Sequence, residues 1–215
     1  MVGALHIGVL ALQGAFREHR LALESCGAKV TEIRRRPGDS ACAGLEKFDG
    51  IVLPGGESTV MGRLLEEEGL LEPLRDCARM GMPVYGSCAG LILMCREVED
   101  ADGSPMKQPV LGILDARVRR NAFGRQTESF ETRLDVAGAA GDMEAVFIRA
   151  PLIVSHGPDV EVLSLVDGPL GRSPAAVRQG NLLATSFHPE LTADRRIHGF
   201  FLNLCLDGRK GAGSI

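Results

Sequence analysis

The stretch that most constrains this chain is residues 82–94, where a short apolar segment runs into a sharp turn and then an apolar, helix-like segment. The turn has the pattern Gly-x-Cys-x-Gly over residues 86–90. This pattern is typical of a nucleophile elbow, whose cramped backbone tolerates only small neighbours. It places Cys88 at a helix N-terminus, where free N–H groups and the helix dipole favour a thiolate. The elbow therefore predicts an α/β fold and makes Cys88 the candidate nucleophile.

The rest of the first half alternates between apolar runs and amphipathic segments. Strands are predicted at 6–12, 29–33, 48–53 and 82–85, and helices at 16–26, 60–67, 70–80 and 91–98. Such alternation favours right-handed crossovers and a mostly parallel sheet with helices on both faces. The predicted fold is thus a three-layer α/β sandwich of the flavodoxin-like kind.

The second half has a different texture, with short strand-like runs and few helical patterns. Strands are predicted at 111–118, 129–136, 145–148, 160–166, 175–177 and 181–187, and a last helix at 193–206. We expect some of these strands to be antiparallel and to extend the same sheet. No linker divides the chain, so we expect one domain over residues 1–207 and a loose tail at 208–215.

Composition excludes several classes of protein. The formal net charge of −4 argues against nucleic-acid binding, and no apolar run reaches the roughly 20 residues of a membrane helix. The first residues lack the features of a secretory signal. None of the six cysteines forms a Cys-x-x-Cys pair or lies near a histidine as in a zinc site, which predicts no metal and a reducing cytoplasm.

Several segments that follow predicted strands carry polar or glycine-rich residues. These are Gln13-Gly14, Gly55-Gly56 and the Cys88 turn. Because ligands bind at the carboxyl ends of parallel strands, the three segments should open on one edge of the sheet. Two consecutive glycines allow close backbone approach to a ligand, although an ordinary strand-to-helix loop is the alternative. Ser58 or Thr59 is expected to cap the next helix.

A catalytic thiolate requires a base, and the base requires an orienting group. Among five histidines, His188 follows a predicted buried strand, and Pro189 favours an extended backbone there. Residues two apart in an extended chain face the same side, so Glu190 can accept a hydrogen bond from His188. Cys88, His188 and Glu190 are the predicted triad. The other four histidines are expected to be structural or at the surface, and His156 is expected to lie in a loop. They are His6, His19, His156 and His198.

The elbow together with His188-Pro189-Glu190 resembles the class I (triad) glutamine amidotransferases. Further segments are similar to one subfamily, the glutaminase subunits of pyridoxal 5′-phosphate synthase (the PdxT/SNO family). Those segments are residues 12–15 with 17–19, 53–59, 120–126, 147–151 and 186–192. The similarity therefore covers nearly the whole chain.

The resemblance implies a reaction and a set of site residues. Members release ammonia from L-glutamine, with no metal or organic cofactor, and pass it to a (β/α)₈-barrel synthase subunit. By similarity, the backbone N–H groups of Gly56 and Ala89 would form the oxyanion hole, and Gln13 would belong to a docking and activating region. The implied glutamine-binding residues are Gly56, Glu57, Ser58, Arg120, Ile148 and Arg149. Either arginine could pair with the substrate α-carboxylate.

Two alternatives to a glutaminase subunit are compatible with the sequence. One is a stand-alone cysteine hydrolase of related fold, such as a γ-glutamyl hydrolase, which would act without a partner. The other is a regulatory binding module that keeps the fold without catalysis. The complete set of Cys88, His188 and Glu190 argues against the second.

Overall fold

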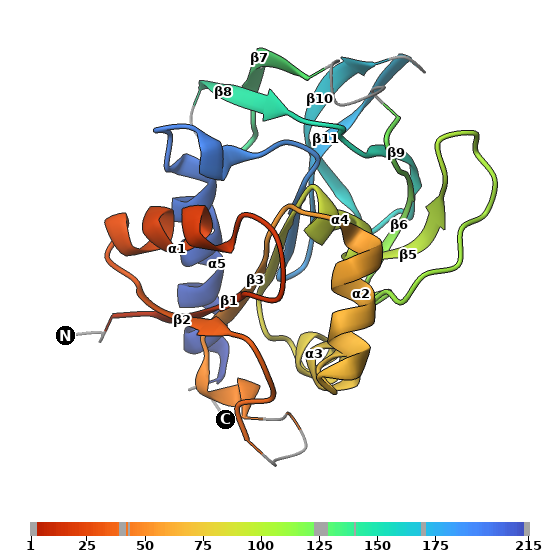
Figure 1. The fold of residues 1–215 in the computed structure, drawn as a ribbon. Helices are drawn as coiled ribbons and strands as arrows, with labels where there is room; N and C mark the ends of the chain where they lie inside the picture. Colours follow the sequence, from red (N-terminus) through yellow and green to blue (C-terminus); the bar gives the residue numbers. More distant parts are fainter. Residues whose placement is uncertain are drawn as a thin grey trace.

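The computed structural model describes residues 4–38, 42, 44–122, 129–139, 141–168 and 171–212. Its centre is a seven-stranded sheet with the order β10-β11-β12-β4-β3-β1-β2 (Figure 1). The strands are β1 (His6–Leu10), β2 (Lys29–Ile33), β3 (Gly50–Leu53), β4 (Val84–Ser87), β10 (Glu161–Gly168), β11 (Gly171–Gln179) and β12 (Leu182–Thr185). The five strands from β12 to β2 run parallel, whereas β10 and β11 are antiparallel to their neighbours.

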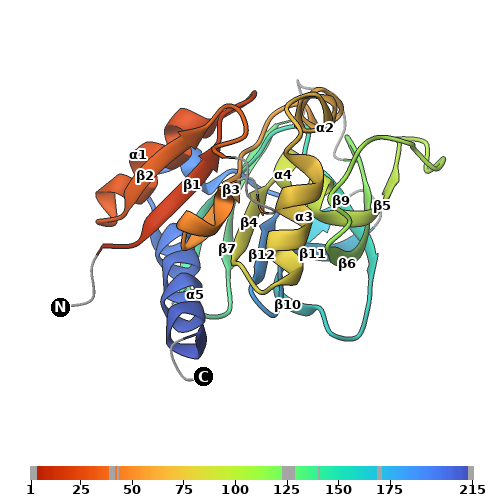
Figure 2. The same ribbon diagram turned by 90° about the horizontal axis from the view of Figure 1, so that it is seen from below.

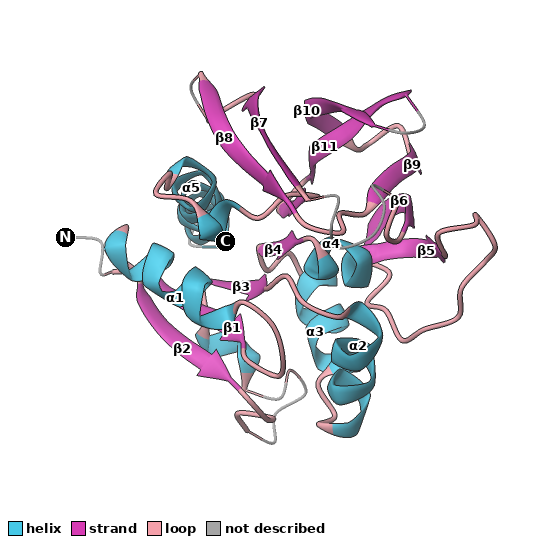
Figure 3. Cartoon of the chain, turned by 45° about the horizontal axis from the view of Figure 1, so that its top comes forward, coloured by secondary structure: helices cyan, strands magenta, loops and turns pink. Residues whose placement is uncertain are grey.

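Helices cover both faces of this sheet. One face carries α1 (Phe16–Ser25) and α5 (Arg196–Ala212), and the other carries α2 (Ser58–Glu67), α3 (Leu71–Arg79) and α4 (Ala89–Met94) (Figures 2 and 3). Alternate residues of β3 divide between two cores. Val52 packs in the core beneath α1 and α5, while Ile51 and Leu53 pack in the core beneath α2, α3 and α4. A strand buried on both faces explains the continuous apolar runs, and the predicted fold class is confirmed.

The expectation that all later strands extend the main sheet is wrong. Only β10, β11 and β12 join it; β5 (Cys95–Glu99), β6 (Leu114–Arg119) and β9 (Leu152–His156) form a separate three-stranded sheet. A further two-stranded sheet consists of β7 (Phe130–Asp135) and β8 (Asp142–Phe147). The two-stranded sheet contributes apolar side chains to the core beneath α1 and α5, and the three-stranded sheet contributes to both cores, so burial is satisfied without extending the main sheet.

Four local expectations are also corrected. The helix predicted at 91–98 ends at Met94, because Cys95–Glu99 pairs with β6 as β5. His156 ends strand β9 rather than lying in a loop. The last helix starts later than expected and continues through residues 208–212, which are therefore helical rather than loose. Glu57, not Ser58 or Thr59, caps α2, since its longer side chain accepts hydrogen bonds from the N–H groups of Thr59 and Val60.

Two short 3₁₀ helices complete the described structure, η1 (Leu45–Lys47) and η3 (Pro189–Leu191). None of the helices in the described ranges has the length and apolar character required to cross a membrane. The predicted tail residues 213–215, and residues 123–126 of the segment at 120–126, lie outside the described residues.

Candidate active site

A cavity of about 320 Å³ lies where the loops that follow β1, β3, β4 and β12 meet. The predicted nucleophile Cys88 and the predicted base His188 both line it. It is also lined by Gln13 and by all the residues implied to bind glutamine, namely Gly56, Glu57, Ser58, Arg120, Ile148 and Arg149. Four other hollows among the described residues are larger, but none of them is lined by both a cysteine and a histidine. The chemistry predicted from the sequence therefore concentrates in the smaller cavity.

Cys88 occupies a strained backbone position between β4 and α4. Its φ of 48° and ψ of −100° are unusual for a residue other than glycine. The backbone N–H of Cys88 donates a 2.8 Å hydrogen bond to the carbonyl of Thr185, which ties the turn to β12. A Cβ on Gly90 would lie 2.1 Å from the carbonyl oxygen of Leu53, and one on Gly86 would lie 2.6 Å from Gly90. The glycines of the elbow are thus required by close packing, and this packing holds Cys88 in its strained conformation at the cavity.

His188 and Glu190 are joined as the sequence predicts. His188 Nδ1 lies 2.8 Å from Glu190 Oε1, and both side chains are buried. Burial alone would lower the pKa of His188, but its interactions with the Cys88 thiol and the Glu190 carboxylate outweigh burial and raise the pKa to about 10. Burial opposes the ionised form of Glu190, yet His19 and His188 together hold the pKa of this carboxyl well below its usual range. The pair is therefore suited to an imidazolium beside a carboxylate.

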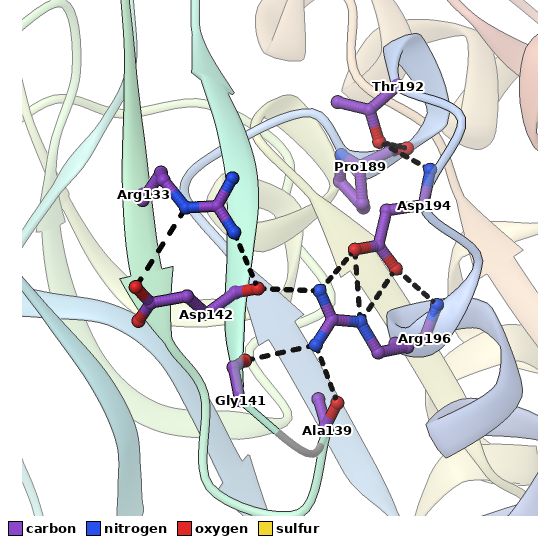
Figure 4. Close-up of polar contacts among 8 residues, drawn as sticks. All are labelled: Arg133, Ala139, Gly141, Asp142, Pro189, Thr192, Asp194 and Arg196. Atoms are coloured by element: carbon purple, nitrogen blue, oxygen red, sulfur yellow. Dashed lines mark hydrogen bonds and ion pairs between the residues drawn. The ribbon is translucent and has the colours of Figure 1, made fainter.

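The segment that carries Glu190 is anchored by the first residue of α5. The Arg196 guanidinium contacts the carbonyls of Gly141 at 3.1 Å and Asp142 at 2.8 Å, and it pairs with the Asp194 carboxylate (Figure 4). The backbone N–H of His188 adds a 2.8 Å hydrogen bond to the carbonyl of Val146 in β8. The β7–β8 hairpin therefore helps to fix the position of the His188 and Glu190 side chains.

The Gly55-Gly56 loop packs tightly against its neighbours. The Ala15 N–H donates a 2.9 Å hydrogen bond to the carbonyl of Gly55, and the Glu57 N–H donates one of 2.8 Å to the Gln13 side chain. Gln13 thus binds the glycine loop directly, so a movement of the segment after β1 would be transmitted to Gly56. Ala89 is the first residue of α4, and its N–H belongs to the helix-terminal donors that lack a partner within the helix.

The two arginines of the cavity differ in their contacts. The Arg120 guanidinium pairs with Glu57 at 2.8 Å and also donates to the Thr59 hydroxyl at 2.8 Å. Arg149 is exposed, has a φ of 44°, and makes no hydrogen bond or ion pair with the described residues. Arg120 is therefore already neutralised by a carboxylate, whereas Arg149 has a free charge in the described cavity.

Three residues near the triad were not identified from the sequence as parts of the site. His19, His198 and Ser87 are fully buried, and His19 Nε2 lies 3.3 Å from Glu190 Oε2. His19 lies three and four residues before the buried Ala22 and Leu23 on α1. That spacing places it on the core-facing side of the helix, a signal that was present in the sequence.

The described residues contain no cluster of three or more His, Cys, Asp or Glu side chains arranged to hold a metal ion. The groups around Cys88 have the arrangement expected of a nucleophile, a base and its orienting carboxylate, which suits acyl transfer from an amide or ester.

Comparisons with known proteins point to one chemistry. The model of the SNO glutamine amidotransferase family matches residues 9–207. A pyridoxal 5′-phosphate synthase subunit PdxT from Frankia alni is 53% identical, over 95% of this chain and 97% of its own. A protein of the same name from Deinococcus radiodurans is also 53% identical, over 92% and 96%. A crystal structure of a glutamine amidotransferase superposes with a TM-score of 0.81 at 46% identity, covering 93% of this chain and 98% of that one.

Proposed function

Because the chain belongs to the SNO glutamine amidotransferase family, we propose that it hydrolyses L-glutamine to L-glutamate and ammonia as the glutaminase subunit of a pyridoxal 5′-phosphate synthase. The family predicted from the sequence motifs is confirmed by the match over residues 9–207. The observation that carries the mechanism is that His188, which lines the same cavity as Cys88, is bound to Glu190 at 2.8 Å.

The chemistry begins when the Cys88 thiol gives its proton to His188 and the resulting sulfur anion attacks the side-chain amide carbon of glutamine. Since His188 uses Nδ1 to bind Glu190, its Nε2 remains for Cys88 and the leaving group. Attack forms a tetrahedral oxyanion, which the backbone N–H groups of Gly56 and Ala89 would stabilise. A donor of this kind typically contributes about 10²–10³ in rate.

Collapse of the tetrahedral intermediate breaks the C–N bond. The protonated His188 gives its proton to the departing nitrogen, which leaves as ammonia, and a γ-glutamyl thioester remains on Cys88. Neutral His188 then takes a proton from water, and the resulting attack releases glutamate and restores the thiol. Glu190 holds the imidazole orientation and stabilises its cationic form throughout. All atoms are supplied by glutamine, water and the triad.

Ammonia released in this way requires a consumer, and the relatives named PdxT are subunits of pyridoxal 5′-phosphate synthase. We infer that a (β/α)₈-barrel synthase subunit docks near Gln13 and the start of α1 and receives the ammonia. Gln13 contacts the Glu57 N–H next to the proposed oxyanion hole, which supports a route from docking to activation.

The experiment that tests this function mixes the chain with a barrel-type synthase subunit, its pentose and triose phosphate substrates, and glutamine labelled with ¹⁵N in the amide. We expect the label in the pyridine ring of pyridoxal 5′-phosphate. Free labelled ammonia without labelled product, or equal activity without any partner, would instead indicate a stand-alone hydrolase.

Arg149 is the better candidate of the two arginines for the substrate α-carboxylate, because Arg120 is paired with Glu57. We expect Arg149→Gln to raise KM for glutamine by about 10- to 100-fold, the usual effect of losing a charge-assisted hydrogen bond, with a smaller change in kcat. The measurement is steady-state glutamate release in the synthase complex. Arg172→Gln, which removes an exposed arginine on β11, serves as the matched control, and an unchanged KM in Arg149→Gln would rule out this assignment.

A further inference from the structure

A second group of buried polar side chains adjoins the triad on the side of Glu190 that faces away from His188. His19 Nε2 lies 2.9 Å from the Ser87 hydroxyl and 3.3 Å from Glu190 Oε2. Its other ring nitrogen, Nδ1, lies 3.1 Å from His198 Nε2. These residues come from α1, β4, η3 and α5, so four separate elements meet at one imidazole.

We propose that His19 is a positioning residue of the reaction, which donates its Nε2–H to the outer carboxylate oxygen of Glu190 and thereby holds the orienting carboxylate against His188. The proposal rests on the triad assigned above. It adds a fourth member, which touches neither the substrate nor the reacting atoms and acts through Glu190.

The needs of Glu190 support this role. Its Oε1 is used by His188, whereas its buried Oε2 has no well-aligned hydrogen-bond partner among the described residues and lies 3.3 Å from His19 Nε2. A buried carboxylate oxygen without a donor is costly. Without a donor to Oε2, the carboxylate would be held by only one hydrogen bond, the one to His188, and could turn about it. His19 Nε2 lies 3.3 Å from this oxygen and 2.9 Å from the Ser87 hydroxyl of the elbow strand, so an N–H at this nitrogen can serve both acceptors.

His198 determines which nitrogen of His19 carries the proton. Burial is the main influence that lowers the pKa of His198 to about 3, so this imidazole is neutral. Only one proton fits between His198 Nε2 and His19 Nδ1. If His198 donates it, His19 keeps its own proton on Nε2, directed to Glu190 and Ser87.

A second unpaired atom of the network, on His198, agrees with this tautomer. His198 Nδ1 is buried and has no partner among the described residues. With the proton on Nε2, this Nδ1 is a bare acceptor, and an unpaired acceptor is better tolerated in protein interiors than an unpaired N–H. The Tyr85 ring packs edge-on against both imidazoles, with its centroid 5.7 Å from that of His19 and 6.2 Å from that of His198.

Three substitutions of His19 test whether its side chain acts by donating a hydrogen bond to Glu190 or only by filling space in the core. The side-chain amide nitrogen of glutamine reaches about where Nε2 of histidine lies, whereas that of asparagine reaches only the place of Nδ1. We therefore expect His19→Gln to preserve the contact with Glu190, His19→Asn to preserve only the contact with His198, and His19→Leu to lose both. All three are measured in the synthase complex with glutamine as the substrate.

We expect His19→Leu and His19→Asn to lower kcat about 10- to 100-fold with little change in KM, and His19→Gln to recover most of the activity. The pH profile gives an independent readout. The depressed pKa of Glu190 keeps it ionised until low pH, and this pKa rises when the His19 donor is removed. The acid limb of kcat/KM should therefore move to higher pH in His19→Leu and remain near that of the unchanged chain in His19→Gln.

Thermal melts accompany the kinetics, and His156→Leu, on the exposed end of β9, serves as the control for a histidine loss. The inference is overturned if His19→Leu keeps the original kcat and pH profile, or if His19→Gln loses as much activity as His19→Asn. If His19→Leu does not fold, the comparison of Gln with Asn decides alone. Absence of glutamine hydrolysis in the unchanged complex would contradict the proposed function instead, so the two failures are distinguishable.

Discussion

Cys88→Ala is expected to lower glutamine hydrolysis by roughly 10⁴-fold or more, because removal of a covalent nucleophile leaves only binding and the oxyanion donors. No other described sulfur can replace it, since Cys88 is the one cysteine that lines the cavity. The side chain is small and buried, so the melting temperature should change by only a few degrees. Glutamate and ammonia release in the synthase complex measure the effect, and mass spectrometry of iodoacetamide-treated protein locates the reactive thiol.

The matched control for this substitution is Cys26→Ala. Cys26 is a half-buried free cysteine at the end of α1, distant from the cavity lining, so its loss should leave hydrolysis unchanged. Ammonia release by Cys88→Ala at a rate near that of the unchanged complex would show that the nucleophile is assigned wrongly. Loss of docking to the synthase subunit would show that the substitution alters more than chemistry.

Gly55→Ala should have the second large effect, although Gly55 carries no side chain and donates no group to the reaction. A Cβ at this position would lie 2.4 Å from Cε1 and 2.8 Å from Nδ1 of His188. Contacts this short force either the imidazole or the glycine loop to move, and Nδ1 is the atom that binds Glu190. Displacement of about 1 Å can cost 10²-fold in rate, so we expect kcat to fall about 10²-fold or more. Overpacking should also destabilise the fold by about 1–3 kcal/mol.

Gly199→Ala is the control for adding a methyl group. A Cβ on Gly199 meets nothing within 4 Å, and the residue lies inside α5, where alanine is favoured over glycine by about 0.5–1 kcal/mol. We expect this variant to be slightly more stable and fully active. If Gly55→Ala has the kcat of the unchanged complex, the imidazole has more room than the structure gives it. Denaturant unfolding of both variants separates loss of stability from loss of positioning.

The triad illustrates how far local sequence patterns reach. The elbow placed Cys88 on a turn after a buried strand, and the spacing of His188 and Glu190 placed their side chains on one side of an extended segment; the structure has both features. These relations are local, because they depend on residues within a few positions of one another. The pairing of the two arginines is not local: Arg120 and Glu57 are far apart in the chain, so only the folded structure shows which arginine is already neutralised.

Sequence periodicity did not predict the buried neighbours of His19 or the pairing of the later strands. The helical spacing identifies the buried face of α1, but four elements must meet before that face gains Ser87, Glu190 and His198 as neighbours. The helix predicted at 91–98 failed for a related reason, since pairing of Cys95–Glu99 with Leu114–Arg119 outweighed the local helical pattern.

The sequence by itself determined the α/β class, the strand-turn-helix that carries Cys88, the histidine and glutamate proposed to serve it, and the family. Each of these depends on short-range spacing and on residue chemistry. The tertiary structure alone decided that β5, β6 and β9 form a separate sheet and that Glu57 forms an ion pair with Arg120. It also decided that Gly55 must lack a side chain, because His188 fills the space. Those outcomes depend on packing between segments distant in the chain, and such packing is fixed only when both cores close around the sheet.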